Sequence, residues 1–298
     1  MERMKLTLAP GKYVIAVSGG VDSMALLDLL ADLPDVRLTV AHYDHGIRDD
    51  SAEDCQLVQA AAAEYGLPFA YRLGRLGPAA SEATARTARY QFLHALRRAS
   101  GAQAIITAHH QDDVLETIVL NLLRGTGPKG LASLRSTDVV QRPLLQVPKQ
   151  ELLRYAKQRG LVWREDSTNA DLRYARNYVR HRLVPRFAEA DRLALLELGR
   201  RTQQLNEQIA VASGDYLRAQ PSPLLLDRHN FVMLPHVVAR EIMAEWLRTQ
   251  TETELTRSLL ERLVVAAKVG RSGSRVDVDG VHWLEIDRTT LALKPRER

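Results

Sequence analysis

The sequence predicts an α/β protein with a parallel sheet covered by helices on both faces, followed by a small α+β domain. Short apolar runs alternate with segments of helical periodicity through the first half of the chain, and repeated β–α units of this kind build parallel sheets. From about residue 149 the pattern is mainly helical, and prolines at positions 221 and 223 mark a boundary. We therefore expect one domain at residues 1–218, with a helical extension from about residue 149, and a second at residues 219–298.

Each element follows from its local pattern. Apolar runs predict buried strands, at residues 13–17, 37–42, 69–72 and 104–108. Helical periodicity predicts the helices of the first domain, at residues 22–33, 51–65, 81–100, 112–124 and 191–218. Beyond the prolines the patterns predict a strand near 224–227, helices near 235–249 and 254–268, and closing strands within 275–293.

Composition excludes several classes of protein. Of the 298 residues, 45% are hydrophobic and 26% are charged, as in an ordinary globular protein. No uncharged apolar stretch approaches the roughly 20 residues needed to cross a bilayer, so we expect no membrane partner. The single cysteine, Cys55, excludes an internal disulfide, which fits a reducing cytoplasm. It also leaves no cysteine pair for sulfur-inserting chemistry.

Positive charge is concentrated in one segment. The net charge of +5 alone is only a weak indication of a polyanionic partner. Between residues 173 and 201 there are three acidic residues and eight arginines, Arg173, Arg176, Arg180, Arg182, Arg186, Arg192, Arg200 and Arg201. A solvated helix face is one interpretation. The absence of lysine from this segment favours phosphate recognition, because the guanidinium fork matches phosphate oxygens.

A glycine loop joins the first predicted strand to the first predicted helix. Residues 18–23 read Ser-Gly-Gly-Val-Asp-Ser. Free backbone N–H groups and the positive end of the helix dipole make such a turn an anion site, and glycines let a phosphate approach the backbone. Asp22 is suited either to cap the helix or to hold Mg²⁺. The lysine of a Walker loop does not follow the glycines.

This loop resembles the pyrophosphate loop of the N-type ATP pyrophosphatases, the PP-loop superfamily. The resemblance implies an adenine-nucleotide-binding fold that cleaves ATP between its α and β phosphates and adenylates a carbonyl oxygen. It implies ATP as co-substrate, Mg²⁺ held at Asp22, and an ATP-binding loop made of Ser18, Gly19, Gly20, Val21, Asp22 and Ser23. For the loop by itself, an ordinary strand–turn–helix corner is the alternative interpretation.

A second polar cluster follows the strand predicted at 104–108. Residues 108–117 read Ala-His-His-Gln-Asp-Asp-Val-Leu-Glu-Thr. Asp113 and Glu116 are three residues apart, so both carboxylates lie on one helix face near its N-terminus. A capping cluster is one interpretation, and zinc is disfavoured because no thiolate or further histidine cluster accompanies it. The sequence resembles the His-His-x-Asp-Asp-x-x-Glu-Thr motif of the tRNA(Ile)-lysidine synthase family, and paired acids suit the binding of a lysine ammonium.

Further stretches carry the same resemblance. They lie at residues 44–48, 85–90, 142–145, 163–169 and 174–180, so the match covers about residues 12–187 in order. The implied reaction ligates free L-lysine to C2 of the wobble cytidine of an isoleucine tRNA with a CAU anticodon, through an adenylated cytidine. The region after Pro221 resembles the first C-terminal domain of that family only weakly, and we expect it to position the tRNA. The sequence leaves the oligomeric state open, with a homodimer as one alternative.

The resemblance also implies roles for individual residues. Asp22, Asp113 and Glu116 are expected to be catalytic, and lysine is expected to bind at Asp113, Glu116 and Asp166. Contacts to the tRNA or the adenylate are expected from five cations, Arg86, Arg124, Lys129, Arg176 and Arg180. The segment 124–131 contains Gly-x-Gly-x-x-Gly but follows a helix, so it does not indicate a dinucleotide site. A basic loop that closes over the active site and a helix C-cap are the alternatives for it.

Three other functions compete with this one. A different PP-loop tRNA-modifying enzyme that inserts sulfur is disfavoured by the lone Cys55. An enzyme that amidates a small molecule is disfavoured because the sequence has no recognisable glutaminase segment. A non-catalytic ATP-binding sensor leaves the acidic cluster and the arginine-rich segment without a purpose.

Overall fold

The structure, a computed structural model, describes residues 4, 6–46, 51–74, 77, 81–164 and 174–296 of the chain. It divides into two compact units, residues 1–202 and 203–298. The division falls within the long helix α8 (Glu189–Arg218), so the last part of that helix belongs to the second unit. Each unit has a hydrophobic core of its own.

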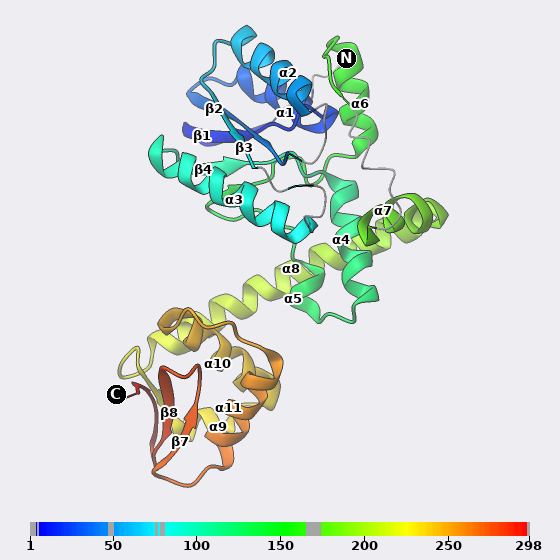
Figure 1. The fold of residues 1–298 in the computed structure, drawn as a ribbon. Helices are drawn as coiled ribbons and strands as arrows, with labels where there is room; N and C mark the ends of the chain where they lie inside the picture. The colour runs from blue at the N-terminus through cyan, green and yellow to red at the C-terminus, as the bar shows by residue number, and fades with distance from the viewer. Residues whose placement is uncertain are drawn as a thin grey trace. The chain divides into compact units, whose positions relative to one another are not determined.

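A five-stranded parallel sheet organises the first unit (Figure 1). Its strands follow the spatial order β3-β2-β1-β4-β5. They are β1 (Gly11–Ala16), β2 (Val36–Asp44), β3 (Phe69–Leu73), β4 (Ala104–Ile106) and β5 (Val140–Gln141). The first four confirm the predicted strands. The fifth lies outside the prediction, because two residues are too few to give a recognisable apolar run.

Helices cover both faces of this sheet, as the sequence predicts. One face carries α1 (Val21–Ala31), α2 (Ser51–Glu64) and α6 (Lys149–Gln158), and the other carries α3 (Glu82–Ala99). Side chains alternate between the faces along a strand. Tyr13 and Ile15 of β1 accordingly lie in the core of the first face, whereas Val14 between them packs with the core that includes Phe92 of α3. One short strand therefore supplies both cores.

The remainder of the first unit is mostly helical. α4 (Gln111–Leu123) follows β4, and Gly125 just beyond its end has a φ of +64°, the conformation of a terminating glycine. The segment 124–131 thus begins as a helix C-cap and continues as the short helix α5 (Pro128–Leu131). Three short turns then lead into α8, namely α7 (Ala175–Tyr178), the π-helical η2 (Val179–Leu183) and the 3-10 turn η3 (Val184–Arg186).

The second unit confirms the predicted α+β organisation. Its antiparallel sheet has the order β6-β9-β8-β7, with strands β6 (Leu225–Asp227), β7 (Ser274–Asp277), β8 (His282–Ile286) and β9 (Thr290–Pro295). The helices α10 (His236–Gln250) and α11 (Arg257–Val269) share a core with this sheet, and α9 (Arg228–Met233) is additional to the predicted elements. None of the helices in the described ranges combines the length and apolar character that a membrane crossing requires.

A buried carboxylate ties three elements of the first unit together. Asp28 of α1 is 1% exposed and accepts hydrogen bonds from the hydroxyls of Tyr65, at 2.6 Å, and Tyr155. Nε and Nη2 of Arg159 also donate to it, both at 2.9 Å. Burial alone would raise the pKa of Asp28, but these donors favour the carboxylate and hold its pKa below the ordinary value. Asp28 thereby joins α1 to the ends of α2 and α6.

We expect Asp28→Asn to lower the free energy of unfolding by about 2 kcal/mol at neutral pH, because Arg159 loses its ionic partner. The folded pKa of Asp28 lies below its ordinary value of 3.8. Its stabilising contribution is therefore present above about pH 4 and is lost as the pH falls through the folded pKa. Urea unfolding of the parent and the variant should show a difference that narrows in acid. A difference that does not change with pH would contradict this ionic role, and Tyr65→Phe, which keeps the ion pair, serves as the control with a loss of about 1 kcal/mol.

Candidate active site

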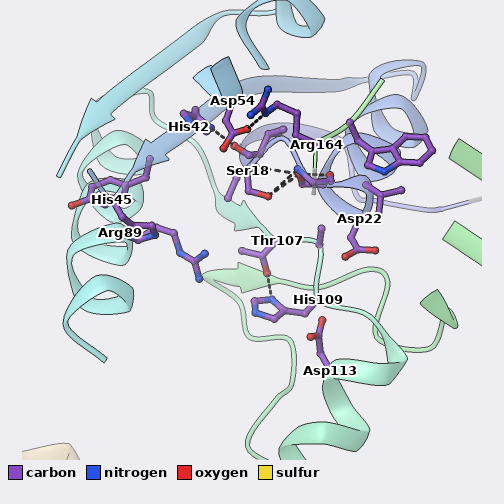
Figure 2. Close-up of a pocket in the computed structure, with 18 of the residues that line it drawn as sticks. Ser18, Asp22, His42, His45, Asp54, Arg89, Thr107, His109, Asp113 and Arg164 are labelled. Atoms are coloured by element: carbon purple, nitrogen blue, oxygen red, sulfur yellow. Dashed lines mark hydrogen bonds and ion pairs between the residues drawn. The ribbon is translucent and has the colours of Figure 1, made fainter. Parts of the chain in front are cut away.

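A pocket of about 660 Å³ lies at the carboxyl ends of β1, β2 and β4. Open α/β sheets bind their ligands at this edge, where the strand order reverses. Figure 2 shows Ser18, Asp54 and Arg164 toward one side of the pocket and His109 and Asp113 toward the other. The two polar segments that the sequence singles out therefore converge on one pocket.

The glycine loop has the geometry of an anion-binding turn. Gly20 is the N-cap of α1 and no side chain caps that helix, so its first N–H groups lack intrahelical acceptors. The two serines brace the turn, because the Ser18 N–H donates to Ser23 Oγ at 3.1 Å and Ser23 Oγ donates to the Gly20 carbonyl at 2.9 Å. Gly19 has a φ of +92°, which a residue with a side chain rarely adopts.

Arg164 fixes this loop from outside. Its backbone N–H donates to the Gly19 carbonyl at 3.0 Å. Its guanidinium pairs with Asp54, Nε to Oδ1 at 2.8 Å, and with Glu53, both in the first turn of α2. The loop is thus held between α2 and the segment that follows α6.

Asp22 faces the pocket with one oxygen engaged and one not. Oδ2 lies 3.5 Å from His110 Nε2 and 3.5 Å from Lys149 Nζ. Oδ1 is buried with no hydrogen-bond partner among the described residues. Within the described ranges no group of three or more His, Cys, Asp or Glu is arranged to hold a metal ion. A single carboxylate with an unsatisfied oxygen nevertheless fits Mg²⁺, which usually takes one or two carboxylates together with substrate phosphates. Asp22 does not cap α1.

The acids of α4 meet two arginines of the arginine-rich segment. Arg180 donates from Nε to Glu116 Oε1 at 2.6 Å and lies 3.3 Å from Asp113 Oδ1 through Nη2. Arg176 Nε is 3.1 Å from Glu116 Oε2. Glu116 is 2% exposed, whereas Asp113 and Arg180 line the pocket. Of the two acids, only Asp113 therefore lines the pocket. Glu116 is buried behind it and forms ion pairs with Arg176 and Arg180.

The surroundings of the two neighbouring histidines shift their pKa values in opposite directions. Burial lowers the pKa of His109, which lines the pocket and lies 2.8 Å from Thr107 Oγ1 through Nδ1. Burial acts in the same direction on His110, but the carboxylates of Asp22 and Asp113 outweigh it and raise the pKa of His110. Burial would raise the pKa of Asp113, yet the two histidines and the His110 N–H, which donates to Oδ2 at 3.0 Å, lower it. Asp113 is thus a carboxylate at neutral pH, and it also caps α4.

Not every residue predicted for the site reaches this pocket. Asp166 and Arg173 lie outside the described residues, so the predicted lysine contact of Asp166 stays a prediction. Arg86, Arg124 and Lys129 are exposed and do not line the pocket within the described ranges. Of the other arginines in the arginine-rich segment, Arg200 and Arg201 pair with Glu197.

Two functional candidates escape the sequence analysis. Lys149 opens α6, and its backbone N–H donates to Asp112 Oδ1 at 3.1 Å while Nζ faces Asp22. Arg164 lies in a stretch that carries the family resemblance, but its hydrogen bond to Gly19 joins distant parts of the chain. No local pattern predicts either contact. The available signals were that Arg164 lies in a stretch that carries the resemblance and that Lys149 begins the region predicted to be mainly helical.

Comparison with known proteins agrees with the fold. A family model described as a PP-loop domain matches residues 2–187. A solved structure, the U34-tRNA thiolase NcsA from Methanococcus maripaludis with its 4Fe-4S cluster, is similar with a TM-score of 0.52 and 19% identity. The likeness covers 66% of this chain and 73% of that one, and it shows the fold alone. The chain is therefore a PP-loop protein, a class that uses ATP.

Similarity to curated relatives identifies the family within this class of PP-loop proteins. A tRNA(Ile)-lysidine synthase from Solibacter usitatus (strain Ellin6076) is 32% identical over 95% of this chain and 70% of its own length. One from Methylobacterium nodulans is 35% identical over 86% of this chain and 80% of its own length. The match to the relative from Exiguobacterium sibiricum, at 43% identity, covers only 43% of that protein. This chain belongs to the tRNA(Ile)-lysidine synthase family.

The two loop glycines give a matched pair of variants. In Gly19→Ala the new side chain would be forced into the left-handed region, so we expect a loss of about 1–2 kcal/mol in the free energy of unfolding. In Gly20→Ala the new Cβ meets Ser18 Oγ at 3.5 Å, an ordinary contact, so stability should stay within about 0.5 kcal/mol. Urea unfolding measures both.

ATP binding then tests the loop itself. Gly20 lines the pocket, and a glycine lets a phosphate approach the backbone without an intervening Cβ. We therefore expect Gly20→Ala to bind ATP weakly in calorimetry although its stability is unchanged. Parental ATP affinity in Gly20→Ala would show that phosphates bind elsewhere.

Proposed function

We propose that this protein ligates free lysine to C2 of the wobble cytidine in an isoleucine tRNA with a CAU anticodon, consuming ATP. The observation that carries the proposal is the convergence, in one pocket, of an anion-binding loop and a paired carboxylate and guanidinium. ATP requires the first and a free amino acid requires the second. The names of the relatives support the choice of tRNA and lysine.

In the first step the cytosine O2 attacks the α-phosphorus of ATP, and the bond to pyrophosphate breaks. The N-terminus of α1 and the braced loop at Ser18–Ser23 bind the phosphates. Lys149 Nζ, 3.5 Å from Asp22, places a positive charge where the leaving pyrophosphate gains negative charge. Donors fixed before the reaction stabilise such charge without reorganisation.

Asp22 would hold Mg²⁺ through its free Oδ1. The ion, when bound, neutralises charge on the phosphate oxygens. Asp22 itself is oriented by Lys149 and His110. Because these contacts engage Oδ2, Oδ1 is the oxygen that remains to bind the ion.

In the second step the neutral lysine Nε, which has already lost its ammonium proton, forms a bond to C2. AMP departs with the former O2, and the nitrogen loses a second proton. Asp113 and Arg180 offer opposite charges side by side in the pocket, which suits the ammonium and carboxylate of a free amino acid. Glu116 acts on lysine indirectly in this proposal, by holding Arg176 and Arg180 in place. In this arrangement Asp113 pairs with the α-ammonium of lysine. The ε-ammonium must lose a proton before Nε attacks C2, because only the neutral amine carries a free electron pair.

The decisive experiment analyses the nucleosides of the tRNA. Total bacterial tRNA is incubated with the protein, ATP and lysine, digested, and analysed by mass spectrometry for a cytidine in which lysine has replaced O2. Omission of lysine should leave only the adenylation step. Release of pyrophosphate that is indifferent to tRNA, with no modified cytidine, would refute the proposal.

Asp22→Ala should lower the rate of pyrophosphate release at saturating ATP by about a hundredfold or more, because a charge fixed at the reacting phosphates is lost. The fold should survive, since Asp22 caps no helix. Circular dichroism measures whether the variant is folded, and a pyrophosphate assay measures the rate. A near-parental rate in a folded variant would remove Asp22 from the chemistry.

Asp113→Asn separates the two steps. One charge-assisted contact to lysine is lost, so the lysine KM should rise by about tenfold to a hundredfold, while the ATP KM changes little. A second variant, Glu116→Gln, should raise the lysine KM and also destabilise the protein, since Arg176 and Arg180 lose a buried partner. If Asp113→Asn leaves the lysine dependence unaltered, its carboxylate serves only to cap α4.

A further inference from the structure

A row of four side chains winds along α3, with Arg86 and Arg98 exposed and Tyr90 and His94 half-buried. Arg86, Tyr90, His94 and Arg98 are each four residues apart, and side chains at this spacing align along a helix. With Thr87 and Gln91 they line a shallow groove of about 580 Å³. We call this set, Arg86, Thr87, Tyr90, Gln91, His94 and Arg98, the α3 groove. It contains no acidic side chain.

The row has cations at its ends and rings in its middle. The guanidinium carbon of Arg86 lies 4.8 Å from the centroid of the Tyr90 ring, and that of Arg89 lies 5.6 Å from it. The ring of His94 is 6.1 Å from that of Tyr90, tilted by 40°. Burial and the charges of Arg97 and Arg98 lower the pKa of His94, so at neutral pH it presents a neutral ring.

This pattern fits RNA better than an acidic protein segment. An acidic peptide needs cations but makes no use of two neighbouring rings. Nucleic acid uses both, since guanidinium groups bind phosphates and aromatic faces stack on unpaired bases. At a rise of about 1.5 Å per residue, Arg86 and Arg98 are about 18 Å apart along the helix, which is long enough to contact several phosphates of one strand.

The α3 groove adjoins the active site through the helix that carries it. Arg89 and Leu93 of α3 line the pocket, whereas Arg86, Tyr90 and His94 line the groove. A strand that places one nucleotide in the pocket can therefore continue past Arg89 to the groove on the same helix. Figure 2 shows Arg89 reaching toward the pocket from this helix.

We propose that the α3 groove binds the RNA strand that flanks the target nucleotide, with the two arginines on phosphates and the Tyr90 ring stacked on a base. The inference rests on the proposed function for the identity of the RNA. The groove would contact phosphates and the faces of bases, so its contribution to RNA affinity does not depend on the reaction in the pocket.

Fluorescence anisotropy tests this with the full chain and a labelled anticodon stem-loop RNA carrying CAU, over a range of salt. Arg86→Gln combined with Arg98→Gln should weaken RNA binding by at least tenfold. It should also lower the slope of log Kd against log salt by about 1.4–1.8, since each lost phosphate contact removes roughly 0.7–0.9. Arg154→Gln combined with Lys157→Gln removes the same charge from exposed positions on α6 and is the matched control, with an RNA Kd within about twofold of the parent. Equal affinity in the α3 and control variants would overturn the proposal.

Substitutions at Tyr90 test the stacking. The Tyr90 hydroxyl has no hydrogen-bond partner among the described residues, so Tyr90→Phe should bind RNA as the parent does. Tyr90→Leu should weaken binding by about tenfold, within the usual range for one lost stacked base. Equal binding by the two variants would refute stacking, and ATP affinity confirms that each is folded.

The readouts also separate this inference from the proposed function. Lost RNA affinity in the arginine variant of α3, without any modified cytidine from the parent, would contradict the reaction and leave the groove as an RNA surface. Modified cytidine formed at parental RNA affinity by that variant would contradict the groove alone.

Discussion

The parallel pairing of β1 with β4 is the constraint on which the site depends. Tyr13 lies opposite Ala104 and Ile15 opposite Ile106, so the chain leaves both strands at the same edge of the sheet. The glycine loop follows the first strand and the histidine–aspartate segment follows the second. Because β2 and β3 lie beyond β1 and β5 lies beyond β4, the order reverses at this pair, and the following helices diverge to leave a crevice. Phosphate donors and carboxylates more than eighty residues apart thus face one pocket.

Charge balance is the second constraint at this edge. A buried carboxylate is costly unless it is paired and hydrogen-bonded, and α4 carries two, at Asp113 and Glu116. Arg176 and Arg180 supply the balance from a segment that follows much later in the chain. The result is a preformed pair of opposite charges at the pocket wall. An amino acid that binds there exchanges one ionic partner for another, so binding need not leave a buried charge uncompensated.

The sequence predicts the framework better than the contacts. Strands and helices of the sheet are predicted because each has a clear period of its own, whereas β5, with two residues, has none. The helical spacing of Asp113 and Glu116 predicts that they are neighbours on α4, and both contact Arg180. Which of them meets the pocket depends on how α4 is rotated against the sheet. The ion pairs of Arg164 and Arg180 join residues 111 and 64 positions apart, and no local pattern specifies such partners. The arginine-rich composition and the family resemblance suggested phosphate contacts for Arg176 and Arg180, while the structure shows their carboxylate partners as well.

The helices α1 and α6 are joined at two points, and these contacts restrict the movement of the glycine loop at residues 18–23, which leads into α1. Asp28 accepts from Tyr155 and Arg159 at the C-terminal end of α6. At the other end of α6, Lys149 lies 3.5 Å from Asp22 in the first turn of α1. Two ionic contacts along one pair of helices fix their rotation as well as their distance. A turn that binds phosphate through backbone N–H groups loses little entropy on binding if those groups already point at the ligand. The buried Asp28 cluster, well away from the pocket, therefore contributes to the direction in which the N-terminus of α1 points.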